Sequence, residues 1–250
     1  MIRADDIAFW IRDQVESSGL NGVIVGLSGG IDSATIVGLA VRGLGSDRVL
    51  GAIMPAHSHP LDVEHAHLVA DAFNIETLTV DLSDPFDRLI AILPTGNQLA
   101  TANLKPRLRM LTLYHLANTR SLMVIGTGNR SELMVGYFTK YGDGGVDLLP
   151  LGSLYKRDVR AIAREIGVPA PIIEKPPSAG LWAGQTDETE MGITYEELDG
   201  VLSAMDHGDT SSFPAELVAK VERMIAGSAH KRRPAPIFVP AEPDSAQEGA

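Results

Sequence analysis

The sequence has 250 residues, of which 32 are acidic, 21 basic and 44% hydrophobic, so its formal net charge is −11. This acidic balance argues against a general nucleic-acid surface, and the lack of any cysteine excludes disulfides, thiolate metal sites and cysteine nucleophiles. Neither an apolar run of roughly 18 residues nor an apolar leader is present. We therefore expect a cytoplasmic protein with no membrane or nucleic-acid partner, whose catalysis uses oxygen, nitrogen or metal chemistry.

Hydrophobic periodicity predicts an alternation of helices and strands along the chain. Apolar residues recur at helical spacing over 4–17, and an apolar run at 23–27 predicts the first buried strand. A helix over about 33–43 completes a first βα unit. Further strands are expected at 48–55, 75–82 and 121–129, and further helices at 61–73, 99–118, 155–167, 194–205 and 213–227.

This order of elements indicates the fold class. Strands that alternate with helices and read as continuous apolar runs are typical of a parallel sheet that is covered on both faces. We expect an α/β fold: a doubly wound, Rossmann-like parallel sheet of five strands with helices on both faces. Residues 1–239 would form one domain, and the composition of 240–250 predicts a disordered tail.

The turn after the first strand carries the strongest functional signal, within the segment VIVGLSGGIDSAT at 23–35. Gly29 and Gly30 allow the backbone to approach a ligand, and the N–H groups of the following helix attract oxyanions. Ser28 and Ser33 add hydroxyl donors, whereas Asp32 would repel a phosphate unless a divalent cation lay between them. We therefore predict a site for a magnesium-bound polyphosphate. The loop lacks the Walker lysine, and the competing interpretation is a plain turn with a helix cap.

A second polar segment, GTGNRSE at 126–132, follows the fourth predicted strand. Ligands of open parallel sheets bind beyond the carboxyl ends of the strands. The glycine loop and this segment both follow strands, so we expect them to build one shared site.

Several longer segments extend the pattern beyond these two loops. They are NLKPRLRMLTLYHLAN at 103–118, GTGNRSELMVGYFTKYGDGGVDLLPLGSLYK at 126–156, KPPSAGLW at 175–182, TDE at 186–188 and HKR at 230–232. Together with SGGIDS they resemble the ammonia-dependent NAD synthetases over nearly the whole chain. That family belongs to the ATP pyrophosphatases with an SGGxDS loop, and the resemblance implies an adenine nucleotide alpha hydrolase-like fold.

The resemblance also implies an activity. It is the ATP-dependent amidation of deamido-NAD to NAD by ammonia, through an acyl-adenylate, with release of AMP and diphosphate as the last step of NAD biosynthesis. Mg²⁺ would be required, ATP would be a co-substrate, and a homodimer is expected. The alternatives are another ATP pyrophosphatase that amidates a different substrate, and a non-catalytic module that binds adenine nucleotides.

Site residues follow from the same resemblance. Asp32 and Glu132 would bind Mg²⁺, and Lys156 would neutralise charge as the phosphates separate. Asp147 would contact the substrate or accept a proton from ammonia, which gives Asp32, Lys156 and Asp147 as catalytic residues. The implied ATP contacts are Gly26, Leu27, Ser28, Gly29, Gly30, Ile31, Asp32, Ser33, Thr127, Lys156 and Ser178. The implied deamido-NAD contacts are Arg107, Lys140, Asp147, His230 and Lys231.

Some of these side chains also have purely structural interpretations. Lys140 and Asp147 would then be solvated charges in a glycine-rich loop, and HKRR at 230–233 would be an exposed basic patch. Arg107 and Arg109 lie two positions apart on a predicted helix and so face different sides. We expect Arg107 to bind substrate and Arg109 to form an ion pair.

Overall fold

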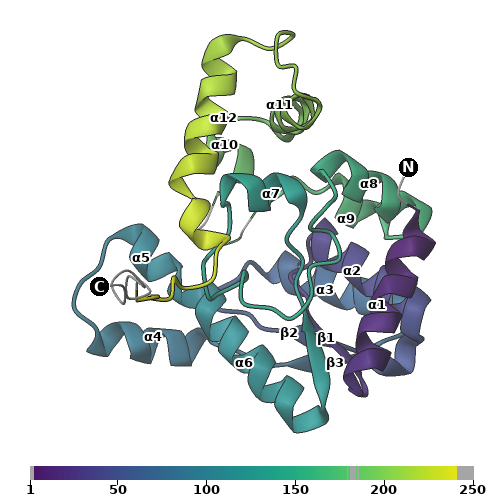
Figure 1. Ribbon diagram of the computed structural model, residues 1–250. Helices are drawn as coiled ribbons and strands as arrows, with labels where there is room; N and C mark the ends of the chain where they lie inside the picture. The colour runs from purple at the N-terminus through teal and green to yellow at the C-terminus, as the bar shows by residue number, and fades with distance from the viewer. Residues whose placement is uncertain (1–2, 179, 181–183, 185, 241–250) are drawn as a thin grey trace, which may run out of the picture.

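The computed structural model describes residues 3–178, 180, 184 and 186–240, and a parallel sheet lies at its centre (Figure 1). Its strands are β1 (Gly22–Gly26), β2 (Val49–Ile53), β3 (Glu76–Thr79) and β4 (Leu122–Ile125), in the order β3-β2-β1-β4. Val23 of β1 pairs with Val49 on one side and Met123 on the other. The chain steps outward from β1 to β3 and then returns to the opposite side of β1. The strand order therefore reverses between β1 and β4, where ligands of such sheets bind.

The sheet has four strands in the described part of the chain, one fewer than predicted. The position beyond β4 is held by a loop in which Leu148 makes a single parallel bridge to Ile125. The Leu148 carbonyl accepts from the N–H of Gly126 at 2.8 Å. Gly145 precedes and Pro150 follows this contact, and both residue types weaken or interrupt a ladder. The fifth strand is thus reduced to one bridge.

Helices cover both faces of the sheet, as predicted (Figure 1). Successive side chains of a strand point to opposite faces, so Val23 and Val25 pack into one core and Ile24 into the other. The first core contains residues of α1 (Ala4–Ser18), α2 (Ile31–Leu44), α3 (Pro60–Phe73), α8 (Lys156–Glu165) and α9 (Ala170–Glu174). The second contains residues of α6 (Leu104–Arg120) and Leu82, which directly precedes α4 (Ser83–Ile92).

Several helix boundaries differ from the prediction by two residues or more. The helix expected over 99–118 is divided at Asn103 into α5 (Gln98–Ala102) and α6, and Pro106 lies in the first turn of α6, where proline is tolerated. Helix α2 begins at Ile31, two residues earlier than expected. Two short 3₁₀ helices, η1 (Ser46–Arg48) and η2 (Ala229–Lys231), complete the described elements.

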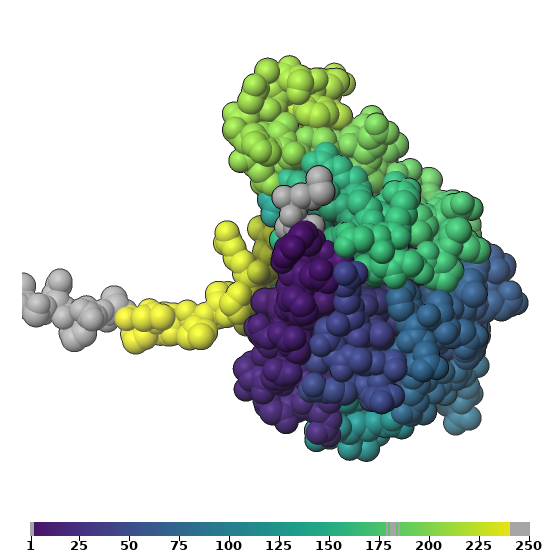
Figure 2. Space-filling model, turned by 90° about the vertical axis from the view of Figure 1, so that its right-hand side faces the viewer, coloured from purple at the N-terminus to yellow at the C-terminus, as the bar shows by residue number. Residues whose placement is uncertain are grey.

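A smaller apolar cluster lies apart from the sheet, and we call it the α11–α12 lobe. It is built from α7 (Arg130–Val135), α10 (Asp187–Met191), α11 (Tyr195–His207) and α12 (Ala215–Gly227). Figure 2 shows α11 and α12 standing on the main body, from which the last described residues extend as an arm. Apart from Pro240, the predicted tail lies outside the described residues. None of the described helices has the length and apolar character needed to cross a membrane.

Candidate active site

The glycine loop between β1 and α2 is held by its own hydroxyl groups. Gly29 has a φ of 72°, and a Cβ atom there would lie 2.3 Å from the Asp62 carbonyl oxygen, so only glycine fits. The Ser33 hydroxyl donates to the Gly30 carbonyl at 3.0 Å and lies 3.1 Å from the Ser28 hydroxyl. Gly30 is the N-cap of α2 and is not assisted by a side-chain cap. The simple capping interpretation therefore fails.

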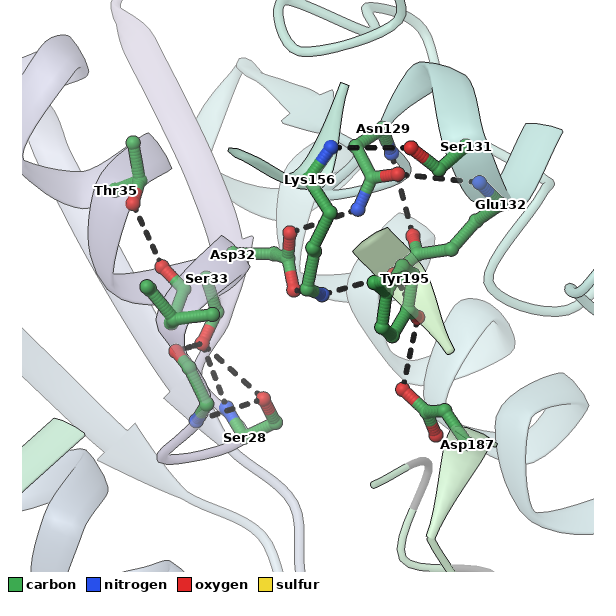
Figure 3. A network of polar contacts seen from close by, with 12 residues as sticks. Ser28, Asp32, Ser33, Thr35, Asn129, Ser131, Glu132, Lys156, Asp187 and Tyr195 are labelled. Atoms are coloured by element: carbon green, nitrogen blue, oxygen red, sulfur yellow. Dashed lines mark hydrogen bonds and ion pairs between the residues drawn. The ribbon is translucent and has the colours of Figure 1, made fainter. Parts of the chain in front are cut away.

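Three charged side chains meet beside this loop (Figure 3). Lys156, which is 1% exposed, places its Nζ 2.5 Å from Oδ2 of Asp32 and 3.1 Å from Oε1 of Glu132. Each residue lies in the first turn of its helix, α2, α7 or α8. Helix N-termini carry partial positive charge, which favours anions nearby. The structure thus brings together three residues that are far apart in the sequence.

Asn129 fixes the two carboxylates relative to each other. Its side-chain oxygen accepts from the N–H of Glu132 at 3.1 Å, and its own N–H donates to Glu132 at 3.3 Å, a capping box that starts α7. Its amide nitrogen donates to Oδ1 of Asp32 at 3.0 Å. Asn129 had no predicted role, although the spacing of asparagine and glutamate in NRSE is a capping-box signal.

Burial and charge act in opposite directions within this cluster. Burial lowers the pKa of Lys156, but the adjacent carboxylates of Asp32 and Glu132 outweigh it, and the net pKa is raised. Burial raises the pKa of Glu132 to about 7, although the Lys156 charge opposes this change. Lys156 is therefore a stable cation, and Glu132 is a carboxyl group whose charge depends on pH near neutrality.

A second layer of hydroxyl and carboxyl groups backs the cluster (Figure 3). The Tyr195 hydroxyl lies 3.1 Å from Glu132 and 3.0 Å from Asp187, and the Tyr137 hydroxyl lies 3.1 Å from Asp187. A phenol has one proton and cannot donate to two carboxylates at once. Burial raises the pKa of Asp187, although the Lys156 charge and the two tyrosine hydroxyls oppose this change. No sequence signal had marked the buried Tyr195 as part of a site.

A cavity of about 380 Å³ is lined by five of the residues just described: Asp32, Glu132, Tyr137, Lys156 and Asp187. All of the ATP contacts implied by the sequence border it except Gly29. The predicted residues on its wall are Gly26, Leu27, Ser28, Gly30, Ile31, Asp32, Ser33, Thr127, Glu132, Lys156, Ser178 and Lys231.

Four predicted basic residues lie together around the Lys231 side of the cavity. Arg107 donates to the Lys140 carbonyl at 3.4 Å, and Lys140 donates to the His230 carbonyl at 2.6 Å. Lys231 donates to two loop carbonyls at 2.7 Å each. Within the described residues none of the four forms an ion pair with a carboxylate, although Asp143 and Glu190 act electrostatically on Lys231 from farther away. HKRR is therefore not a detached surface patch.

Asp147 does not reach this cavity. Its carboxylate accepts from the Tyr114 hydroxyl at 2.8 Å and from the Val124 N–H at 2.9 Å, because the bridge of the loop to β4 turns the side chain away. The earlier aspartate of the same loop, Asp143, lines the cavity instead, and its enclosure there raises its pKa. Of the two aspartates in this loop, the predicted Asp147 lies away from the cavity, and Asp143, which was not predicted, lines it.

Arg109 departs from the expected ion pair. Its guanidinium donates to the Met54 carbonyl at 3.0 Å and lies 3.4 Å from the Ser58 hydroxyl. Because these groups come from the end of β2 and the loop after it, Arg109 is drawn toward the cavity, which it lines. Both arginines of the pair at 107 and 109 therefore belong to the site region.

Comparison with known proteins identifies the architecture. A model of the family described as NAD synthase matches residues 3–235. The NH(3)-dependent NAD(+) synthetase of Archaeoglobus fulgidus is 49% identical over 233 residues, which cover 92% of this chain and 94% of the relative.

Solved structures give the same result. The NMN synthetase of Francisella tularensis superimposes with a TM-score of 0.87 at 35% identity and covers 94% of this chain and 96% of its own. The NH3-dependent NAD synthetase of Campylobacter jejuni gives 0.83 at 28% identity, with 94% and 97% covered. With a matching family model and close relatives over nearly its full length, this chain belongs to the NAD synthase family.

Proposed function

We propose that the chain amidates deamido-NAD to NAD with ammonia and consumes ATP as co-substrate, as a ligase that forms a C–N bond. Its relatives are named for ammonia-dependent NAD synthesis. The observation that carries the proposal is the arrangement of one cavity. A glycine loop with two carboxylates and a buried lysine lies on one side. Around Lys231 lie basic side chains that form no carboxylate ion pair within the described residues. Such a cavity suits a triphosphate and a second anionic nucleotide.

The proposed reaction has two steps. A carboxylate oxygen of the nicotinate group attacks the α-phosphorus of ATP, an O–P bond forms, and the bond to the bridging oxygen breaks to release diphosphate. Ammonia then attacks the carbonyl carbon of the acyl-adenylate, a C–N bond forms, and AMP leaves with the C–O electron pair while one proton is lost. The protein mainly has to stabilise charge on the two leaving groups.

The donor set at Asp32 and Glu132 suits Mg²⁺. Both residues offer hard carboxylate oxygens, and these already converge on one cation, the Lys156 ammonium. Asp32 and Glu132 would hold the ion, which when bound neutralises phosphate charge and makes diphosphate a better leaving group. Lys156 would direct its N–H groups to the same phosphate oxygens.

The remaining ATP contacts have simple roles. Ser28 and Ser33 would donate hydroxyl hydrogen bonds to phosphate oxygens, and the backbone N–H groups at the start of α2 would add their partial positive charge. Thr127 follows β4 across the switch point, and Ser178 follows the two prolines after α9. We assign both hydroxyls to ATP as well.

The deamido-NAD phosphates would bind Arg107, Lys140, His230 and Lys231. Asp147 does not line the cavity of its own chain. It keeps its predicted contact with the substrate only if substrate bound to a second copy reaches it. We also propose the homodimer that the resemblance to the family implies. Light scattering of the purified protein tests it.

The similarity to an NMN synthetase supports a second candidate substrate, the mononucleotide acid in place of deamido-NAD. The two candidates are separated by supplying ATP, Mg²⁺ and ammonium with each acid in turn and measuring AMP and the amide. We expect a higher kcat/KM with deamido-NAD. A preference for the mononucleotide would replace our proposal by the second candidate, and ATP binding without AMP formation would indicate a nucleotide-binding module.

A further inference from the structure

Lys175 is a second lysine beside the glycine loop. It follows directly after α9, and its Nζ lies 2.6 Å from Oδ1 of Asp62 on α3 and 3.5 Å from the Gly29 carbonyl. Both side chains line the same cavity as Lys156. The ion pair is partly exposed, at 23% for Lys175 and 26% for Asp62. The ammonium therefore lies at the edge of the loop, where a ligand in the cavity can contact it.

The backbone on both sides of the ion pair is fixed. A Cβ atom at Gly29 would lie 2.3 Å from the Asp62 carbonyl oxygen, so α3 packs directly against the glycine loop. After Lys175 come Pro176 and Pro177, which restrict the chain, and the Pro177 carbonyl accepts from the N–H of Asp187 at 3.1 Å. Lys175 is thereby anchored near the loop at both ends of its segment.

The two lysines differ in how well their charge is compensated. Lys156 contacts two carboxylates and is almost completely buried, so its charge is balanced within the chain while no ligand is bound. Lys175 contacts one carboxylate in a partly hydrated setting, where an ion pair is weak and easily exchanged. A polyphosphate carries several charges, and a lysine ammonium is a compact phosphate-binding group with three donors.

We propose that Lys175 binds the terminal phosphates of ATP and the diphosphate that leaves, and that Asp62 is its counter-ion while phosphate is absent. This inference rests on the proposed function, because it adds a binding residue to the same ATP site. Lys175 exchanges the Asp62 carboxylate for a phosphate oxygen when the nucleotide binds. No bond is made or broken by it.

The competing explanation is a structural tether between α3 and the chain after α9, and substitution of each partner separates the two. A tether is lost equally from either side, so Lys175→Met and Asp62→Asn would have the same effect. If Lys175 binds phosphate, the two substitutions should change the affinity for phosphate in opposite directions. Lys175→Met removes the ligand, whereas Asp62→Asn removes its competitor and leaves the lysine free.

The experiment measures binding of inorganic pyrophosphate with Mg²⁺ by calorimetry, and the KM for ATP and for deamido-NAD. We expect Lys175→Met to weaken pyrophosphate binding and raise the KM for ATP at least tenfold, with the KM for deamido-NAD changed less than twofold. Asp62→Asn should bind pyrophosphate as tightly as the wild type or severalfold more tightly. Lys220→Met is the matched control, because Lys220 contacts a loop carbonyl in the α11–α12 lobe, and it should change nothing.

Equal weakening by Lys175→Met and Asp62→Asn, or no weakening by Lys175→Met, would overturn the inference. If Lys175→Met does not fold, the affinity of Asp62→Asn for pyrophosphate decides alone, since a decrease contradicts the exchange. The wild type could prove inactive on deamido-NAD while Lys175→Met still weakens pyrophosphate binding. That result would refute the proposed function and leave this inference standing.

Discussion

The two charged regions of the cavity are built on different principles. At the glycine loop, Lys156 is buried between two carboxylates that Asn129 holds in place, so the cation and its counter-charges come from the chain itself. Around Lys231, the basic side chains are held by backbone carbonyls and form no carboxylate ion pairs within the described residues. The first region is prepared to receive a cation together with its phosphates. In the second, the carboxylates of Asp143 and Glu190 act on Lys231 only from farther away, so an anionic substrate would add a direct contact.

The largest effect should come from the first region. Asp32→Ala removes one of two carboxylates that we assign to Mg²⁺, and we expect NAD formation to fall roughly a thousandfold or more because leaving-group charge is no longer neutralised. The fold should persist, since Lys156 keeps Glu132 as a partner. Steady-state assays and thermal unfolding measure both quantities. Asp47→Ala, an exposed aspartate in η1, is the control, and retained activity in Asp32→Ala would refute the metal assignment.

A smaller and more selective effect is expected in the second region. Lys231→Met removes a charge that forms no ion pair within the described residues. Loss of one charge-assisted contact is worth about 1.5–3 kcal/mol, or roughly a 10- to 100-fold higher KM for deamido-NAD. The KM for ATP should stay unchanged. Arg233→Met removes an exposed charge from the same HKRR segment and serves as the control. Equal changes in both KM values would show that the two regions are not separate.

These two regions also differ in how far the sequence predicts them. The glycine loop, the helix after it and a cation beside Asp32 could be predicted, because the loop residues are contiguous and each residue type has a local physical role. The layer behind it could not, since Tyr195 becomes part of the site only through a contact 63 positions away with Glu132. Asp147 shows the opposite limit. Loop position alone does not tell which of two aspartates faces the cavity, because a single bridge to β4 decides it.

The apparent Mg²⁺ affinity of the first region should change about tenfold with pH, which distinguishes it further from the second region. Burial raises the pKa of Glu132 to about 7, and Mg²⁺ binds the deprotonated carboxylate, so the apparent Mg²⁺ affinity should rise about tenfold between pH 6 and 8. In the metal-free protein, the raised pKa means that stability is lost as the pH rises from the ordinary glutamate value through about 7. Calorimetry and thermal unfolding test both effects. Glu132→Gln should abolish the fall in stability, and an unchanged profile in that variant would assign the titration to another group.

The smallest effect is expected at the aspartate that lies outside the cavity. Asp147→Asn keeps one acceptor oxygen for the Tyr114 hydroxyl or the Val124 N–H and loses the other, so we expect a loss of about 1 kcal/mol in the free energy of unfolding. The kcat should change less than twofold from pH 6 to 9, because the carboxylate does not face the reacting groups of its own chain. Asp143→Asn is the matched comparison and should lower kcat, since Asp143 lines the cavity. A pH-dependent loss of kcat in Asp147→Asn would instead restore that residue as the proton acceptor and require a second copy to bring it to the substrate.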